Sequence, residues 1–286
     1  MINSYDYIFD KKGNIYTVRG KTQTGVVATL TYYKSQQRLT REKKACSYKK
    51  LNINPLEHSI SEFEIPYSKI TKVVPFSSRN QRILDLQSPF SSICQRIVQN
   101  CQADVYLFGS RLLQLEKTTS DFDYIIDTTE RIEEITQYIA MFSEVSNLSN
   151  SRISKRASRY RLDSPGIEHE TAIWLAKNCT SYINVNGQEI GIFFTNTKYS
   201  CPFIPSCVNN LAKHNFSGYF IHTAESCYMP RILKVKNEFE EIRVITTSWL
   251  LFNATQWQGY VQLTNLFHLS DNYYFFSNNH SQISFE

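Results

Sequence analysis

The hydrophobic pattern of this 286-residue chain changes its period twice, and this change restricts the fold more than any other feature. Segments 15–19 and 25–33 are rich in β-branched and aromatic residues, which favours strands. From about residue 79, apolar residues recur every three or four positions, which is typical of helices. After residue 199 the pattern returns to short β-type runs at regular intervals.

The sequence therefore predicts an α+β fold with β-rich parts on both sides of a mixed centre. The predicted parts are an N-terminal β-rich domain (1–78), a central domain with a mixed sheet and helices on one face (79–198), and an all-β C-terminal domain (199–286) that forms a small barrel or a sandwich.

The central part is predicted to alternate between strands and helices. Asn186-Gly187, which stands between two β-forming runs, is a strong signal for a hairpin turn. The predicted elements are strands at 103–108 and 122–126, helices at 111–116, 129–142 and 168–177, and a hairpin over 182–194.

The targeting signals and the cysteine pattern predict a cytoplasmic protein. The N-terminus lacks the basic start and apolar run of a secretory signal, and the longest apolar stretches are too short to cross a bilayer. The seven cysteines include no Cys-x-x-Cys pair, so we expect free thiols in a reducing compartment and no structural zinc. We expect no membrane partner, and the sequence leaves the oligomeric state open.

The main chemical signal lies between Tyr106 and Ile126. A predicted strand ends at Gly109-Ser110. Ten residues follow, the last of which is Ser120, and Asp121-Phe122-Asp123 then opens a second strand. Side chains two apart on a strand leave the same face, so both aspartates face one way while Phe122 points into the core. Two carboxylates placed together repel one another unless a divalent cation lies between them, and Mg²⁺ or Mn²⁺ bound to nucleotide phosphates suits such oxygen ligands.

The first half of this motif is suited to phosphate. Gly109 permits close approach of the backbone to a ligand, and Ser110 stands at a predicted helix start, where unpaired N–H groups favour anions. Arg111 follows directly and is a further candidate for phosphate contact, with pairing to an acid as the alternative. Together with Ser120, these residues are the predicted nucleotide-binding set.

The combination of Gly-Ser, ten residues and Asp-x-Asp, framed by helices, resembles the nucleotidyltransferase superfamily of the DNA polymerase beta type. More narrowly, it is similar to a set of predicted nucleotidyltransferases known mostly from archaea and bacteria. Tyr48-Lys49-Lys50 resembles a basic element in the N-terminal β-region of that set, and Tyr228-Met229-Pro230 resembles the start of its C-terminal β-domain. The resemblance implies that Asp121 and Asp123 bind the metals and that Gly109 and Ser110 hold the β- and γ-phosphates of a nucleoside triphosphate.

The third carboxylate of that superfamily has no direct counterpart here. In the hairpin strand that resembles its location, the expected acid position is Gly191. Glu189 lies two residues earlier on the same face and is our candidate for the third acid, with an exposed hairpin residue as the alternative. Loss of this acid would weaken metal binding and remove the base that acts on the acceptor hydroxyl.

The net charge of +5 hides a strong separation along the chain. Between 104 and 144 there are nine acidic and three basic residues, whereas 152–161 holds five basic residues and no acid. A second basic segment, 34–50, holds seven basic residues and one acid. Basic segments beside an acidic metal site suit a polyphosphate or nucleic acid, and solvated loops are the alternative. The predicted phosphate contacts are Lys49, Lys50, Arg156, Arg159 and Arg161, with Arg159 and Arg161 alternating so that they project together.

The sequence thus predicts a metal-dependent nucleotidyltransferase. It would transfer a nucleoside monophosphate from an NTP to an acceptor hydroxyl on RNA, protein or a small molecule, and release pyrophosphate. The alternative is a catalytically degenerate protein of the same fold that binds nucleic acid through its basic segments. A toxin or defence enzyme that modifies tRNA or protein is a third reading, which the sequence does not separate from the first.

Overall fold

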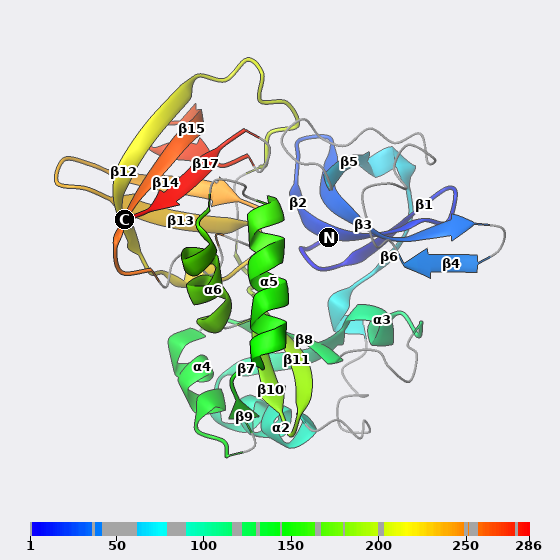
Figure 1. The fold of residues 1–286 in the computed structure, drawn as a ribbon. Coiled ribbons are helices and arrows are strands. Elements are labelled where there is room, and N and C mark those ends of the chain that lie inside the picture. Colours follow the sequence, from blue (N-terminus) through cyan, green and yellow to red (C-terminus); the bar gives the residue numbers. More distant parts are fainter. Residues whose placement is uncertain are drawn as a thin grey trace.

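The structure is a computed structural model with three β-sheets and seven helical segments in the part of the chain that it describes (Figure 1). The described residues are 2–35, 38–41, 62–78, 90–115, 122–129, 132–143, 145–163, 167–179, 181–199, 203–248, 251, 257–277 and 280–286. The fold is mixed α+β with more strand than helix, as the sequence predicts.

The central sheet is mixed and has the strand order β7-β8-β11-β10-β9. β8 pairs antiparallel with β7 and parallel with β11, and β10 and β11 form the hairpin predicted around Asn186-Gly187. The strands are β7 (Ala103–Phe108), β8 (Phe122–Thr128), β9 (Val145–Ser146), β10 (Tyr182–Val185) and β11 (Gln188–Thr195). A single turn of helix, α3 (Gly109–Leu112), follows β7.

Two amphipathic helices cover one face of this sheet. Apolar residues at helical spacing, such as Ile93 and Ile97 of α2 (Ser91–Asn100) and Ile135 of α4 (Ile132–Ala140), are buried against it. Phe122 lies in the same core, as predicted from its place between two polar neighbours. The opposite face therefore carries the alternate residues, including Asp123.

The N-terminal sheet is antiparallel and packs against that opposite face. Its strand order is β4-β3-β2-β1-β6. β4 and β5 pair with the same edge of β3, β5 with its N-terminal half and β4 with its C-terminal half. Tyr5, Tyr7 and Phe108 share one aromatic cluster, which joins this sheet to the central one. The strands are β1 (Tyr7–Asp10), β2 (Ile15–Lys21), β3 (Gly25–Ser35), β4 (Arg38–Arg41), β5 (Glu62–Pro66) and β6 (Ile70–Val74), with a short 3-10 helix η2 (Tyr67–Lys69) before β6.

The C-terminal sheet closes into a barrel of five strands, which decides between the barrel and the sandwich that the sequence allowed. The ring runs β12-β13-β14-β16-β15 and returns to β12. β16 pairs with the C-terminal half of one edge of β15, and β17 pairs with the N-terminal half of the same edge. The strands are β12 (Lys213–Ile221), β13 (Arg231–Lys236), β14 (Glu241–Thr246), β15 (Tyr260–Ser270), β16 (Tyr273–Phe275) and β17 (Gln282–Phe285), with η4 (Ala224–Ser226) before β13. Tyr228-Met229-Pro230 leads into β13, the second strand of the barrel, rather than into its first.

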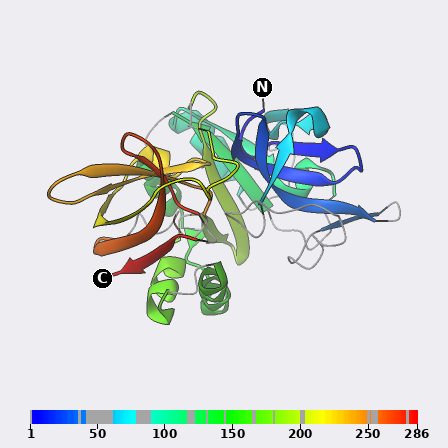
Figure 2. The ribbon, with the colours of Figure 1, turned by 90° about the horizontal axis from the view of Figure 1, so that it is seen from above.

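Two further helices pack together beside the barrel, and the first of them also contacts the central sheet. α5 (Asn150–Asp163) and α6 (His169–Lys177) bury Ile153, Ala157 and Leu175 in the same core as the barrel (Figures 1 and 2). The barrel also packs against the N-terminal sheet, because Val27 and Phe267 belong to the same buried cluster. The N-terminal sheet, the central sheet and α5 line one shared space, and the barrel packs behind them.

Candidate functional site

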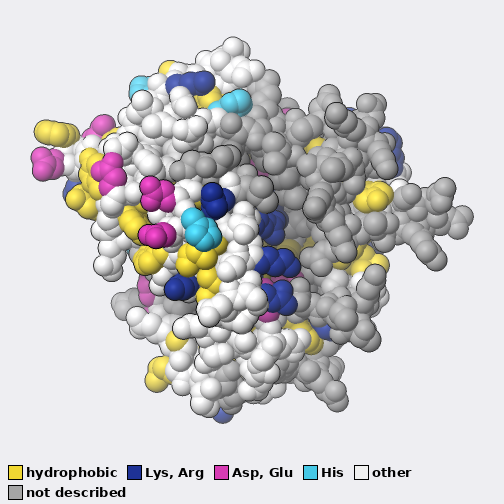
Figure 3. Space-filling model, in the orientation of Figure 1, with side chains coloured by type: hydrophobic (Ala, Val, Ile, Leu, Met, Phe, Trp, Pro, Cys, Tyr) yellow, Lys and Arg dark blue, Asp and Glu magenta, His cyan; other side chains and the backbone are white. Residues whose placement is uncertain are grey.

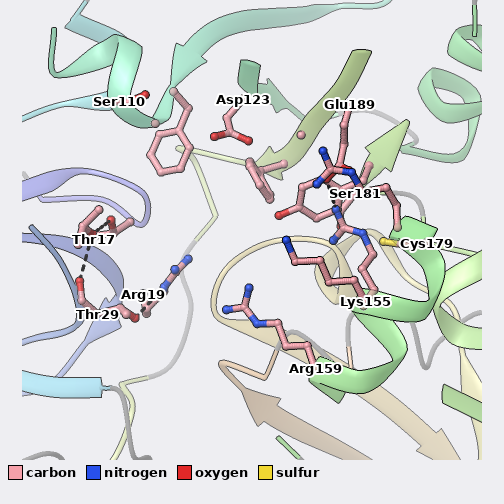
Figure 4. Close-up of a pocket in the computed structure, with 18 of the residues that line it drawn as sticks. Thr17, Arg19, Thr29, Ser110, Asp123, Lys155, Arg159, Cys179, Ser181 and Glu189 are labelled. Carbon is pink, nitrogen blue, oxygen red and sulfur yellow. Dashed lines mark hydrogen bonds and ion pairs between the residues drawn. The ribbon is translucent and has the colours of Figure 1, made fainter. Parts of the chain in front are cut away.

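A cavity of about 490 Å³ lies between the N-terminal sheet, the central sheet and α5 (Figure 4). This volume falls within the roughly 300–1,000 Å³ that is typical of small-molecule sites. β2 and β3 form one wall, the β7–α3 junction with β8 and β11 forms the second, and α5 forms the third. The polar lining residues are Thr17, Arg19, Thr29, Thr31, Ser110, Asp123, Arg152, Lys155, Arg156, Arg159, Ser181 and Glu189.

Asp123 lies on the floor of the cavity between two glycines. In the parallel β8–β11 pair, Asp123 is the direct partner of Gly191. A Cβ on Gly191 would overlap Asp123 Oδ1, and a Cβ on Gly109 would lie 2.7 Å from Asp123 Oδ2. Gly109 also has a φ of +73°, in the left-handed region that L side chains rarely adopt. The carboxylate of Asp123 thus occupies space that only glycine leaves open on both sides.

Burial and the negative charge of Asp123 raise the pKa of two tyrosines that line the same cavity, Tyr7 and Tyr182. Burial is the main cause that raises the pKa of Tyr7, and Asp123 is the second. Burial likewise raises the pKa of Tyr182 to about 12, again with Asp123 as the second cause. Both phenols therefore stay protonated beside the carboxylate at neutral pH.

The third wall of the cavity is the basic face of α5. Residues 152, 155, 156 and 159 are spaced by three and four, so they fall on one side of the helix and all line the cavity. In Figure 4, Lys155 and Arg159 extend from α5 toward the centre of the cavity. Ile153, Ala157 and Tyr160 are buried in the core that α5 shares with α6 and the barrel.

This helix corrects the prediction that Arg159 and Arg161 project together. Alternation places two residues on one face only in a strand, whereas in a helix residues two apart diverge by about 200°. Arg159 lines the cavity, and Arg161 is exposed and lies outside its lining. Arg152 and Lys155, absent from the predicted contacts, could have been found from the same spacing of three and four.

Glu189 also lines the cavity, but it is bound to the basic face of α5. Arg156 Nη2 donates a hydrogen bond of 2.6 Å to Glu189 Oε1, and Arg152 Nε lies 3.2 Å from Oε2. The Glu189 side chain is only 16% exposed, so it is not the exposed hairpin residue that the alternative described. The Glu189 carboxylate therefore neutralises two arginines of α5 and does not form a pair of metal ligands with Asp123.

The residues of the first wall were not predicted from the sequence. Arg19 on β2 is half-buried, donates a hydrogen bond of 3.2 Å from Nε to Thr29 Oγ1, and extends toward the cavity in Figure 4. Burial lowers the pKa of Arg19, and the nearby tyrosines and Glu62 partly offset this. No local signal in the sequence connects Arg19 to Asp123, because only the packing of two sheets brings them to one space.

The remaining predicted residues fall in two groups. Arg111 lies outside the cavity lining, and its guanidinium stacks on the ring of Phe122 with 3.7 Å from Cζ to the ring centroid. Asp121, Ser120, Lys49 and Lys50 lie outside the described residues.

The donors present suit a cation that phosphate oxygens help to hold. Among the residues that the structure describes, no three His, Cys, Asp or Glu side chains form a metal-binding group. Mg²⁺ is commonly bound by one or two carboxylates together with substrate phosphates, rather than by a full set of protein ligands. Asp123 could supply one carboxylate to such a site, and the five basic side chains of the cavity would face the phosphates rather than the cation.

The surface around the cavity shows the same charge pattern. In Figure 3, Lys and Arg side chains gather near the centre of the face, beside the place of α5 in Figure 1.

In the described part of the chain, the helices all lack the length and apolar character needed to span a membrane. Comparisons of the chain with protein-family models, curated proteins and solved structures found no match.

Proposed function

We propose that this protein is a metal-dependent nucleotidyltransferase that transfers a nucleoside monophosphate from an NTP to an acceptor hydroxyl. The observation that carries the proposal is the meeting of Gly109, Ser110 and Asp123 with the basic face of α5 in one cavity. These groups are distant in sequence, and each has a separate use for a metal-bound triphosphate.

The residues divide the work by charge. Asp123, with Asp121 as its predicted partner, would hold a divalent cation, which would neutralise phosphate charge and polarise the reacting phosphorus. Ser110 would donate a hydrogen bond to phosphate, and the close approach that Gly109 permits would bring the backbone to the same group. The basic side chains of α5 would balance the remaining charge of the triphosphate.

The transfer itself exchanges one phosphorus–oxygen bond for another. The acceptor oxygen forms a bond to the α-phosphorus as the bond to the pyrophosphate oxygen breaks, and the acceptor proton leaves to a carboxylate of the cavity. The chain contributes mainly by holding the reactants in place and by matching charge, which are the main contributions in phosphoryl-transfer sites.

The test is metal-dependent release of pyrophosphate from labelled NTPs, with total RNA supplied as acceptor. The double variant Asp121→Ala with Asp123→Ala is expected to abolish turnover, whereas Asp104→Asn, an exposed acid on β7 of the same sheet, is expected to retain it. Retained turnover in the double variant would show that the assignment is wrong.

A second candidate is a nucleic-acid-binding protein without transfer activity. The pairing of Glu189 with Arg152 and Arg156 favours it, because the cavity then offers a basic wall and few available carboxylates. This candidate predicts salt-sensitive binding of RNA or DNA that persists in the double aspartate variant and is accompanied by no release of pyrophosphate.

A further inference from the structure

Glu189 holds a place in the cavity that is built for an oxyanion. Its two carboxylate oxygens face Arg156 Nη2 at 2.6 Å and Arg152 Nε at 3.2 Å, so one carboxylate spans two arginines. Arginine pairs bind phosphate and carboxylate oxygens in the same manner. A phosphate group that enters the cavity would therefore have to compete with Glu189 for Arg152 and Arg156.

Arg156 is held in position independently of Glu189. Its guanidinium stacks on the ring of Tyr182, with 3.3 Å from Cζ to the ring centroid. Burial by itself lowers the pKa of Arg156, but Tyr182, Cys179 and Glu189 outweigh it, and the pKa is raised. The stack keeps the guanidinium facing the cavity whether or not Glu189 is bound to it.

The Arg152 half of the pair is the weaker one. The Arg152 side chain is 49% exposed, so water competes for it and weakens its attraction to Glu189. Glu189 lies two residues before Gly191 on β11, on the strand face that carries Asp123 on the neighbouring strand. A Glu189 side chain that leaves the arginines would therefore stay on the cavity side of the sheet.

We propose that Arg152 and Arg156 form a phosphate-binding site in which Glu189 takes the place of a phosphate group until one arrives. This deepens the proposed function, on which it rests for the nature of the ligand, by stating which wall of the cavity receives phosphate. The phosphate belongs either to the triphosphate of an NTP or to the backbone of a nucleic-acid acceptor, and the exchange is the same in both. Ligand binding is weakened by the need to displace Glu189.

The experiment measures binding without metal, so that it is separate from transfer. Full-length protein is titrated calorimetrically in EDTA with inorganic tripolyphosphate, and in parallel with a short RNA oligonucleotide that has no terminal phosphate. Glu189→Gln removes the competing charge and keeps the side-chain shape, so we expect about tenfold tighter binding, or roughly 1.4 kcal/mol. Arg152→Gln and Arg156→Gln are expected to weaken binding about tenfold.

Matched controls separate this effect from net charge. Glu170→Gln, on the exposed face of α6, makes the same charge change as Glu189→Gln and is expected to leave binding within about twofold. Arg161→Gln is the equivalent control for the arginine variants, because it lies on α5 outside the cavity lining. Tighter binding of tripolyphosphate alone assigns the site to the triphosphate, and tighter binding of RNA alone assigns it to the acceptor.

Unchanged or weaker binding of both probes by Glu189→Gln would overturn the proposal. If that variant does not fold, Arg152→Gln decides, since an exposed side chain tolerates substitution, and full retention of binding would again overturn it. The proposed function has a different signature of failure. If the natural protein shows no transfer activity but the variants change phosphate binding as expected, the enzymatic function is rejected and the phosphate site stands.

Discussion

Gly191 lies directly beside Asp123 in the parallel β8–β11 pair, and the Asp123 carboxylate fills the space where a side chain at Gly191 would begin. The resemblance noted in the sequence implies a third acid at the Gly191 position. Here Gly191 has no side chain, and this leaves room for the carboxylate of Asp123. Gly191 therefore shapes the site and supplies no ligand to it.

Gly191→Ala is therefore expected to lower activity far more than stability. The added methyl group would displace the end of a flexible side chain, Asp123, while the surrounding backbone stays in place. A misplacement of about 1 Å at a reacting centre can cost about 100-fold in rate, so a loss of that order in metal-dependent turnover is expected. Turnover measured beside thermal unfolding checks this, and an active, stably folded variant would contradict it.

Gly109→Ala is expected to affect both stability and nucleotide binding, and Gly187→Ala separates the two effects. Both glycines have positive φ, at +73° and +82°, so each substitution should cost about 1–2 kcal/mol of unfolding free energy. Only at Gly109 would the new Cβ approach Asp123, at 2.7 Å from Oδ2, because Gly187 has nothing within 4 Å.

Urea denaturation and metal-dependent ATP binding measure the two effects. We expect similar losses of stability in both variants, and a loss of ATP binding in Gly109→Ala alone. Equal ATP binding by the two variants would show that Gly109 has only a conformational role.

Arg159→Gln is expected to weaken ATP binding by about threefold to fivefold, as is usual for an exposed charge pair. Arg161→Gln on the same helix is expected to have no effect, because it lies outside the cavity lining. The difference should shrink at high salt, which screens exposed charges. Equal effects of the two substitutions would mean that ATP does not bind on the side of α5 that carries Arg159.

Alkaline pH is expected to destabilise the fold through buried tyrosines. Burial raises the pKa of Tyr228 from 10.0 to about 12, and that of Tyr182 to the same value. A raised pKa in the folded state means that folding favours the protonated phenol, so this stability is complete below about pH 10 and is lost as the pH rises toward 12.

Urea denaturation over this pH range measures the effect, and Tyr228→Phe is its control. The phenol of Tyr228 donates a hydrogen bond of 3.0 Å to the carbonyl oxygen of Thr128. The variant should lose about 1 kcal/mol at neutral pH, where that hydrogen bond is missing. It should also lose less additional stability above pH 10 than the natural protein, and an identical pH dependence would argue against a buried phenol.

Much of the secondary structure was predictable because it follows local patterns. The alternation of Phe122 and Asp123, the three–four spacing in α2 and α4 and the Asn186-Gly187 turn all appear in the structure as predicted. α5 was missed because its composition is strongly polar. Its apolar residues are few, yet Ile153, Ala157 and Tyr160 have helical spacing and are buried.

The sequence by itself determined the order of the strands and helices from β7 to α4, the face that Asp123 occupies and the separation of acidic from basic segments. It did so because strand and helix periodicity depend on neighbouring residues. Only the tertiary structure decided that Arg19, Asp123, Arg156 and Glu189 share one cavity, and that Glu189 is bound to arginines of α5. The physical reason is that these contacts arise from the packing of two sheets and a helix, which no local propensity encodes.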